Sequence, residues 1–307
     1  MSYRLLTYEI DGRPRAGLLT GDRIHDLAEA TRRAEWSTVL GALQQWEQAR
    51  HACREAAGRL APTAGGLALD DAVLRAPILY PGTIYCAGAN YTDHVAEMFA
   101  AQGLPMGPTM KELGDQPWHF IKTSRSAVVG PGAAVAIPND TRWLDWEIEL
   151  AAVIGQPAKN VSAAEALDHV AGFTIANDLS ARDHMKRAAQ DPMSPFYYDW
   201  IGQKCFDGAC PIGPWIVPAD DIGDPHELGM KLWVGDELMQ DSNSNKLIFD
   251  IAEQIAALSA RVTLQPGDLV LTGTPAGVGM GRKRFLQSGE QVRLWIEGIG
   301  ELRHSIA

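Results

Sequence analysis

Acidic and apolar residues alternate strictly in the segment LDWEIEL, residues 144–150, which spaces Asp145, Glu147 and Glu149 two positions apart. In a β-strand, residues two apart project from the same face, so this spacing predicts three carboxylates side by side. On an exposed face they would belong to an ordinary amphipathic strand, where the repulsion is small. The following residues, AAVI, are all apolar and indicate a strand buried on both faces. Buried carboxylates need a cation or hydrogen-bond donors.

A further acid, Asp178, follows the strand-like run GFTIAN. Taken alone, an aspartate in this position is more often a turn or cap residue. Combined with the acidic strand, it predicts a cluster of hard oxygen ligands that lacks a matching His or Cys cluster. Such a cluster favours Mg²⁺ or Mn²⁺ over zinc, with waters or substrate oxygens completing an octahedron.

A candidate acid–base pair lies in GANYTDHVAE, residues 88–97, which follows an apolar run and is typical of a turn that opens a helix. The three-residue spacing places His94 and Glu97 on one helix face. A carboxylate beside an imidazole orients the ring and favours its charged form, as in a general base. The alternative is a surface helical pair, and the spacing alone favours that alternative.

The elements that must position these residues form two parts. A hairpin around Asp11, a strand leading into a helix in RIHDLAEA, and helices near residues 34–45 and 47–59 indicate a small N-terminal domain, residues 1–76. Residues 77–307 contain recurrent short apolar runs punctuated by Gly and Pro, which predict a β-rich main domain rather than repeated βαβ units. One clear helix, FDIAEQIAALSARV, presents Ile251, Ile255 and Leu258 as an apolar stripe.

The segment of residues 98–117, MFAAQGLPMGPTMKELGDQP, shows no steady strand or helix period and carries three Gly and three Pro. A loop of that length in a compact domain is usually a functional lid or disordered. Its position directly after His94 and Glu97 predicts a lid over the site.

The composition excludes several classes of protein. A net charge of -11 without any basic run argues against nucleic acid as a partner. The opening residues lack the order of a signal peptide and no apolar stretch is long enough to span a bilayer, so we expect a cytoplasmic protein without a membrane partner. The four cysteines form neither a CxxC pair nor a dense framework, which suits a reducing compartment.

Five motifs occur in the order NYTDHVAE, DWEIEL, NDLSARD, QKCFDGACPIGP and GDLVLTGTPAGVG. In this order and at these separations they closely resemble the fumarylacetoacetate hydrolase family, from about residue 84 to the end of the sequence. The resemblance implies an α+β, β-rich fold, with a mixed β-roll or β-sandwich main domain, a small N-terminal α/β domain and a homodimer. It also implies that Glu147, Glu149 and Asp178 hold the metal and that His94 with Glu97 activates water.

By the same resemblance Lys204 is catalytic and contacts the substrate, together with Arg182 and the turn at Thr274. Without the resemblance, Arg182 would pair with a nearby acid and Lys204 would be a surface cation. The sequence departs from some family hydrolases at Met185, where they carry Gln, and this leaves the substrate open. His184, beside it, either touches the substrate or is a structural hydrogen-bonding residue.

The implied reaction is hydrolytic cleavage of a carbon–carbon bond in a small 1,3-diketo or 2-oxo acid of the acylpyruvate type, with Mg²⁺ or Mn²⁺ as cofactor. The same scaffold serves oxaloacetate-type decarboxylation and isomerisation or tautomerisation of 2-hydroxymuconate-like acids. A binding module without catalysis and a structural scaffold are the remaining alternatives, and neither explains the complete set of acidic, basic and imidazole residues.

Overall fold

The computed structural model describes residues 2–60, 65–138 and 140–307. The α-helices are α1 (Leu27–Thr31), α2 (Val39–Leu43), α3 (Trp46–Leu60), α4 (Thr92–Ala101), α5 (Ser124–Ala127), α6 (Ala163–Ala166), α7 (Trp200–Lys204), α8 (Ile251–Arg261) and α9 (Gly279–Arg282). Short 3-10 helices are η1 (Ala34–Trp36), η2 (Leu69–Asp71), η3 (Leu167–His169), η4 (Arg182–His184), η5 (Ala219–Asp221) and η6 (Ser244–Lys246).

The strands are β1 (Arg4–Ile10), β2 (Arg13–Thr20), β3 (Arg23–Asp26), β4 (Leu67–Ala68), β5 (Val73–Arg75), β6 (Ile84–Ala87), β7 (His119–Lys122), β8 (Val128–Val129), β9 (Ala134–Val135), β10 (Leu144–Asp145), β11 (Ile148–Ile154), β12 (Val170–Asn177), β13 (Ser180–Ala181), β14 (Cys210–Pro218), β15 (Gly229–Val234), β16 (Glu237–Asn243), β17 (Leu269–Leu271), β18 (Gln291–Ile296) and β19 (Gly300–Ile306). The architecture is mixed α+β and rich in strands, as the sequence predicts.

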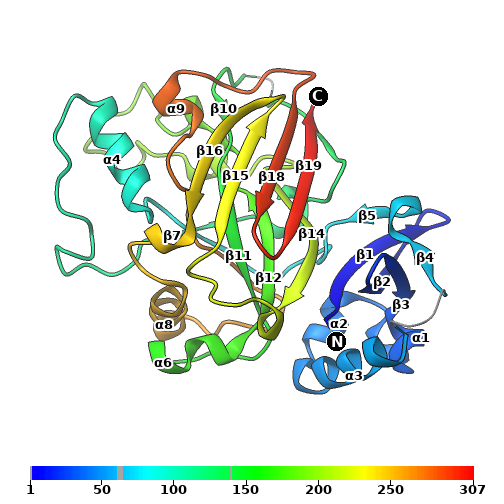
Figure 1. Ribbon diagram of the computed structural model, residues 1–307. Helices are drawn as coiled ribbons and strands as arrows, with labels where there is room; N and C mark the ends of the chain where they lie inside the picture. The colour runs from blue at the N-terminus through cyan, green and yellow to red at the C-terminus, as the bar shows by residue number, and fades with distance from the viewer. Residues whose placement is uncertain (1, 61–64, 139) are drawn as a thin grey trace.

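Two sheets organise the main body. The larger runs in the order β4-β3-β2-β1-β14-β12-β11-β17-β6-β7, and the smaller in the order β16-β15-β18-β19-β9. The small sheet covers one face of the central strands β11 and β12 (Figure 1). Neighbouring strands are mostly antiparallel, although β17 pairs with β6, β14 with β8 and β19 with β9 in parallel.

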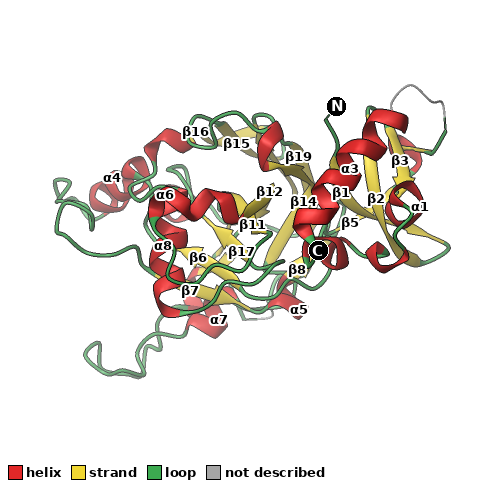
Figure 2. Ribbon diagram, turned by 90° about the horizontal axis from the view of Figure 1, so that it is seen from below, coloured by secondary structure: helices red, strands yellow, loops and turns green. Residues whose placement is uncertain are grey.

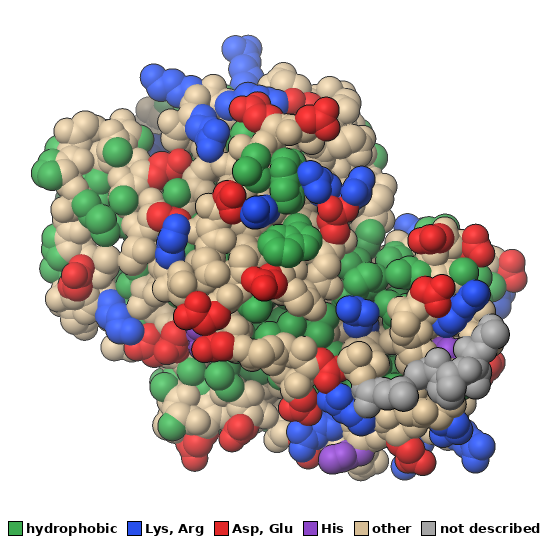
Figure 3. Space-filling model, in the orientation of Figure 1, with side chains coloured by type: hydrophobic (Ala, Val, Ile, Leu, Met, Phe, Trp, Pro, Cys, Tyr) green, Lys and Arg blue, Asp and Glu red, His purple; other side chains and the backbone are tan. Residues whose placement is uncertain are grey.

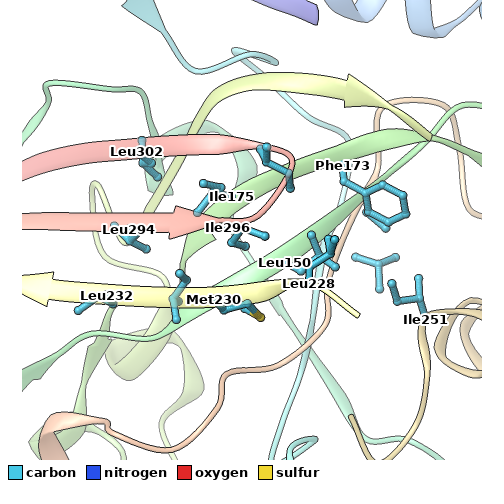
Figure 4. Close-up of a cluster of buried hydrophobic side chains, with 14 of the residues drawn as sticks. Leu150, Phe173, Ile175, Leu228, Met230, Leu232, Ile251, Leu294, Ile296 and Leu302 are labelled. Carbon is cyan, nitrogen blue, oxygen red and sulfur yellow. The ribbon is translucent and has the colours of Figure 1, made fainter. Parts of the chain in front are cut away.

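The core between the sheets explains why β11 and β12 are apolar at most positions. Leu150, Phe173 and Ile175 face Met230, Leu232, Leu294, Ile296 and Leu302 of the small sheet, and Ile251 of α8 closes one end (Figure 4). The alternate residues of β11, among them Ala151 and Val153, belong to a second core that includes the N-terminal helices. A strand with a core on each side carries apolar residues at every position.

The N-terminal elements confirm most of the local predictions. β1 and β2 form the hairpin around Asp11, β3 leads into α1, and α3 matches the helix expected near residues 47–59. These elements lie together beside the main body (Figure 1), yet β1 joins the large sheet through the pairing of Leu5 with Ile216. The division at residue 76 therefore stays a prediction.

Three local predictions are wrong in detail. Residues 34–45 form η1 and the short α2 rather than one helix. The segment 144–150 is not one strand, because the chain leaves the strand conformation between β10 and β11. The segment 98–117 begins inside α4, so only the residues after Ala101 are a loop. That loop lies beside α4, and a second long loop projects beside α7 (Figure 2).

Surface features are mixed in character. Acidic and basic side chains are interspersed over the face shown in Figure 3, and apolar side chains gather at its left side, over α4 and the loop that follows. Within the described residues, no helix combines the length and apolar character needed to cross a bilayer.

Candidate active site

The pairing of β11 with β12 brings the acidic residues together. Ile148 pairs with Asn177 and Glu149 with Ala176, so Glu147 lies opposite Asp178, and the Asp178 N–H donates to the Glu147 carbonyl oxygen at 2.9 Å. Directly opposed residues of an antiparallel pair project from the same face, as do residues two apart. One oxygen from each of Glu147, Glu149 and Asp178 consequently lies within 4.8 Å of the other two.

Two buried lysines and a partly buried arginine surround this carboxylate cluster. The Lys204 ammonium donates to Glu147 at 2.8 Å and to Asp178 at 2.6 Å. Lys122, at the end of β7, donates to the other oxygen of Asp178 and to the Leu179 carbonyl oxygen. Arg182 donates to Glu147 as well. Buried charges are tolerated when they are paired in this way.

Glu147 and Glu149 differ sharply in their electrostatic surroundings. Burial raises the pKa of Glu147, but Arg182 and Lys204 outweigh this effect and leave that pKa well below its ordinary value. Burial and the charges of Asp178 and Glu147 raise the pKa of Glu149 well above its ordinary value. Among the described residues, the hydrogen bond given to the Glu149 carboxylate comes from the Gly273 N–H, at 2.8 Å.

The environment of Glu149 fits a divalent cation. A carboxylate pressed against two others, without a cationic side chain bonded to it, is stable as an anion only if a further positive charge approaches it. The donor set consists of three carboxylates, and hard oxygen ligands suit Mg²⁺, Mn²⁺ or Ca²⁺. Glu147, Glu149 and Asp178 can therefore hold a divalent metal ion.

The predicted acid–base pair lies on the first turns of α4. His94 is buried, and its Nδ1 lies 3.4 Å from Glu97 Oε2. Glu97 also accepts from the Gly277 N–H at 3.0 Å, while Asp93, one turn earlier, accepts from the Ala276 N–H at 3.2 Å. Asp93 and Glu97 therefore hold the turn after β17 against α4, and Glu97 also orients His94.

The turn at residues 273–277 approaches the site closely, as predicted. Gly273 and Gly277 have φ angles of 102° and 103°, which favour glycine. A Cβ atom at Gly277 would lie 2.1 Å from the Met239 carbonyl oxygen. Thr274 is held by Gln240, whose amide nitrogen donates to its hydroxyl at 2.9 Å.

One cavity of about 310 Å³ joins these groups. His94, Glu147, Glu149, Lys204 and Thr274 all line it. Its remaining wall is mostly apolar and aromatic, with the following side chains among its lining: Met98, Met110, Met185, Trp118, Phe120 and Trp200. The predicted base, two of the three predicted metal ligands and the predicted substrate contacts therefore face the same space.

Several predicted residues have a different immediate role. Asp145 is outside the carboxylate cluster: it accepts from the Gly279 N–H at 2.6 Å, from the Met280 N–H at 3.0 Å and from Arg182 at 2.9 Å. Arg182 is thus paired with two carboxylates, those of Asp145 and Glu147, although it also lines the cavity. His184 Nε2 lies 3.2 Å from exposed Asp140.

Lys122 and Gln203 were not predicted from the sequence. Lys122 ends an apolar run, HFIK, with no acid nearby in the chain, so its partner Asp178 becomes evident only when β7 and β12 are placed together. Gln203 precedes Lys204 and also lines the cavity. The sequence signal that could have identified Gln203 is its position beside Lys204 in a short helix.

Comparison with known proteins identifies the family. The model of the fumarylacetoacetate (FAA) hydrolase C-terminal domain matches residues 83–307. The chain belongs to the fumarylacetoacetate hydrolase family. This confirms the resemblance carried by the five motifs.

Relatives within the fumarylacetoacetate hydrolase family carry out different reactions. The chain is 42% identical, over 76% of its length and 68% of the relative, to a mitochondrial oxaloacetate tautomerase of Xenopus laevis. It is 30% identical to maleylpyruvate hydrolase from Sphingobium sp. SYK-6, solved with manganese(II) and pyruvate, with a TM-score of 0.76 and coverage of 99% and 98%. A 5-carboxymethyl-2-hydroxymuconate delta-isomerase from Mycobacterium smegmatis is 30% identical, with a TM-score of 0.72 and coverage of 99% and 98%.

Proposed function

We propose that the protein is a divalent-metal-dependent hydrolase that cleaves a carbon–carbon bond in a small 1,3-diketo acid of the acylpyruvate type. The observation that carries this proposal is that His94, which contacts Glu97, and the carboxylates Glu147 and Glu149 line a single cavity. A base beside a metal site is the arrangement that hydrolysis of such a bond requires.

The proposed cofactor is Mg²⁺ or Mn²⁺, held by Glu147, Glu149 and Asp178. When bound, such an ion would polarise the substrate carbonyl groups and stabilise negative charge that develops on their oxygens. The maleylpyruvate hydrolase structure, which contains manganese(II) and pyruvate, supports this choice of cofactor and of a pyruvate-like ligand.

The charge of the cluster suits an anionic substrate. When all are ionised, the four buried carboxylates of the triad and Asp145 face three cations, the buried Lys122 and Lys204 and the partly buried Arg182, which leaves one negative charge in excess. A divalent ion would convert this excess into one positive charge. A 2-oxo carboxylate would then be attracted to the site, because the field of opposite charges acts strongly where water is excluded.

His94 would take a proton from water, and the water oxygen would add to the carbonyl carbon of the acyl group. Glu97 would stabilise the imidazolium that results. The bond between the acyl carbon and the neighbouring carbon breaks, and its electron pair passes to the pyruvate enolate. Protonation of that enolate gives pyruvate and a carboxylic acid. Lys204 would contact the developing oxyanion, with Arg182 and Thr274 as further substrate contacts.

A panel of acylpyruvates assayed with Mg²⁺ and with Mn²⁺ tests this proposal. In ¹⁸O-labelled water, hydrolysis places one label in the released carboxylic acid. Turnover that depends on either ion and incorporates the label supports the proposal. Loss of substrate without cleavage, or cleavage that is independent of added and bound metal, contradicts it.

A second candidate is tautomerisation or isomerisation of a 2-oxo acid, and the oxaloacetate tautomerases among the relatives favour it. This reaction needs a proton transferred by His94 but no attacking water. It forms no cleavage product, whereas oxaloacetate-type decarboxylation releases carbon dioxide and no second carboxylic acid. Analysis of the products therefore separates all three reactions. A cytoplasmic location and a homodimer stay predictions.

A further inference from the structure

His304 is a polar residue in the core between the two sheets. It lies on β19 and is buried, with 1% of its surface exposed. Leu302 and Ile306, two positions away on either side, share its face of the strand and belong to the core, where Figure 4 shows Leu302. A polar ring in such a core needs a hydrogen-bond partner. His304 finds this partner on the other sheet, because its Nε2 lies 2.9 Å from Nδ2 of Asn177 in β12.

The side chain of Asn177 has a fixed orientation. Its Oδ1 accepts from the Glu147 N–H at 2.9 Å, and a backbone N–H can only donate, so the amide oxygen must face Glu147. The amide nitrogen therefore faces His304 and donates to it. Nε2 is then the acceptor, which requires a neutral ring with its proton on Nδ1. Burial favours this neutral form, since it lowers the pKa of His304 to about 4.

Glu147 depends on this contact more than a residue within a strand would. It lies in the break between β10 and β11, where the chain is outside both strands. Its two backbone groups bond to the end of β12 and the residue that follows: the N–H donates to the Asn177 side chain, and the carbonyl oxygen accepts from the Asp178 N–H. The orientation of the Asn177 amide therefore affects where the Glu147 carboxylate lies.

We propose that His304 is a positioning residue for the metal site. By accepting from Asn177 it holds the amide that binds the backbone of Glu147, and Glu147 is thereby fixed beside Glu149 and Asp178. This assignment rests on the proposed function, because it concerns the carboxylates that would hold the proposed cofactor. Within the described residues, the lining of the cavity does not include His304, so it acts through Asn177 rather than on the substrate.

Calorimetric titration with Mn²⁺ tests the assignment. His304→Leu removes the acceptor and should raise the Kd for Mn²⁺ by about 10- to 100-fold, the loss typical of removing a group that supports a metal ligand. His304→Gln places an amide oxygen near the position of Nε2 and should recover most of this loss. Asn177→Ala should also weaken binding, and adding His304→Leu to it should have little further effect, because the two residues act through one contact.

Leu294→Ala is the control variant for a general loss of stability. Leu294 is fully buried in the same core, so its truncation should lower the midpoint of urea unfolding without changing the Kd for Mn²⁺. The tautomer of His304 is measured separately by ¹⁵N NMR of the metal-free parent, with the signals of this ring assigned by their absence from His304→Gln. We expect a neutral ring with its proton on Nδ1.

Mn²⁺ affinity in His304→Leu like that of the parent overturns the assignment, as does an equal loss of affinity in Leu294→Ala, a charged ring or a proton on Nε2. Unchanged affinity in Asn177→Ala has the same consequence, and this variant decides the matter if His304→Leu does not fold. A parent without affinity for Mn²⁺ overturns the assignment together with the proposed metal site. The expected affinities in a parent that cleaves no acylpyruvate support the assignment and remove only the hydrolase proposal.

Discussion

The site has one side formed by strands, the sheet wall, and another formed by helix α4, the helix wall. The two walls hold their polar groups in different ways. In the sheet wall, Glu147, Glu149 and Asp178 lie on or beside paired central strands and are almost completely buried among cations. In the helix wall, His94 and Glu97 lie on α4, next to an exposed loop, and the contact between them is 3.4 Å. The side chain of Glu97 is 22% exposed.

This difference separates binding from chemistry. A metal ion requires fixed ligands, and strands buried on both faces supply them before any ligand arrives. A general base requires a short contact only when the substrate is bound, so a loose contact in the free protein is compatible with catalysis. We therefore expect substitutions in the sheet wall to alter stability and metal affinity, and substitutions in the helix wall to alter turnover.

The largest effect should come from the helix wall. His94→Ala should lower kcat by about 10² to 10⁴ and leave metal and substrate binding intact, because a positioned general base contributes in this range. Glu97→Gln should also slow turnover, and the double variant should be little slower than His94→Ala. Steady-state kinetics and calorimetry on the three variants measure this. Turnover within a few-fold of the parent in His94→Ala would rule out the proposed mechanism.

The next effect concerns stability of the sheet wall. Lys122→Met removes a fully buried cation from Asp178, and loss of one partner from a buried pair costs about 3 to 5 kcal/mol. Lys111→Met is the matched control, since Lys111 pairs with Glu253 at the surface and such pairs contribute about 0 to 1 kcal/mol. Urea unfolding of both metal-free variants measures the difference. Equal stability losses would contradict a structural role for Lys122.

Glu149→Gln should weaken metal binding by more than about 10- to 100-fold, the loss typical of removing a residue that merely supports a ligand. The metal-free variant should be at least as stable as the parent at neutral pH, because the amide carries no buried charge. Titration with Mn²⁺ and urea unfolding together measure the two opposite effects. Metal affinity like that of the parent would remove Glu149 from the ligand set.

The pH dependence of that stability difference follows from the raised pKa of Glu149. Above the ordinary value of 4.5 the unfolded chain releases this proton while the folded, metal-free protein retains it. Folding then binds a proton, so this residue makes the parent less stable as the pH rises through the window between the two pKa values. The advantage of Glu149→Gln should grow over the same window, and an advantage that shrinks would contradict the direction.

The smallest effect concerns the segment of residues 98–117, which we predict to be a lid. Met98 and Met110 line the cavity, and Lys111 ties the loop to Glu253 of α8. Limited proteolysis should cut the free protein between α4 and β7, and Mn²⁺ with a non-reacting 2-oxo acid should slow the cut several-fold. The loop before α7 provides an internal reference. Equal cleavage with and without ligand would count against a lid.

Part of the site could be predicted from the sequence because it depends on local periodicity. Two-residue spacing placed Glu147 and Glu149 on one face of a strand, and three-residue spacing placed His94 beside Glu97 on a helix. Both relations hold in the structure. The apolar residues after Glu149 also predicted burial correctly, because only a strand with a core on each side is apolar at every position.

The sequence by itself determined the hairpin, most of the longer helices, the shared face of Glu147 and Glu149 and, through five ordered motifs, the family. Only the tertiary structure decided which charges meet. Asp145 belongs to the alternating pattern but bonds to Arg182 and the start of α9, whereas Lys122, distant from every acid of the cluster in the chain, pairs with Asp178. Spacing along the chain fixes which side chains share a face, but the pairing of distant strands fixes which faces meet, and the buried ion pairs form where those faces meet.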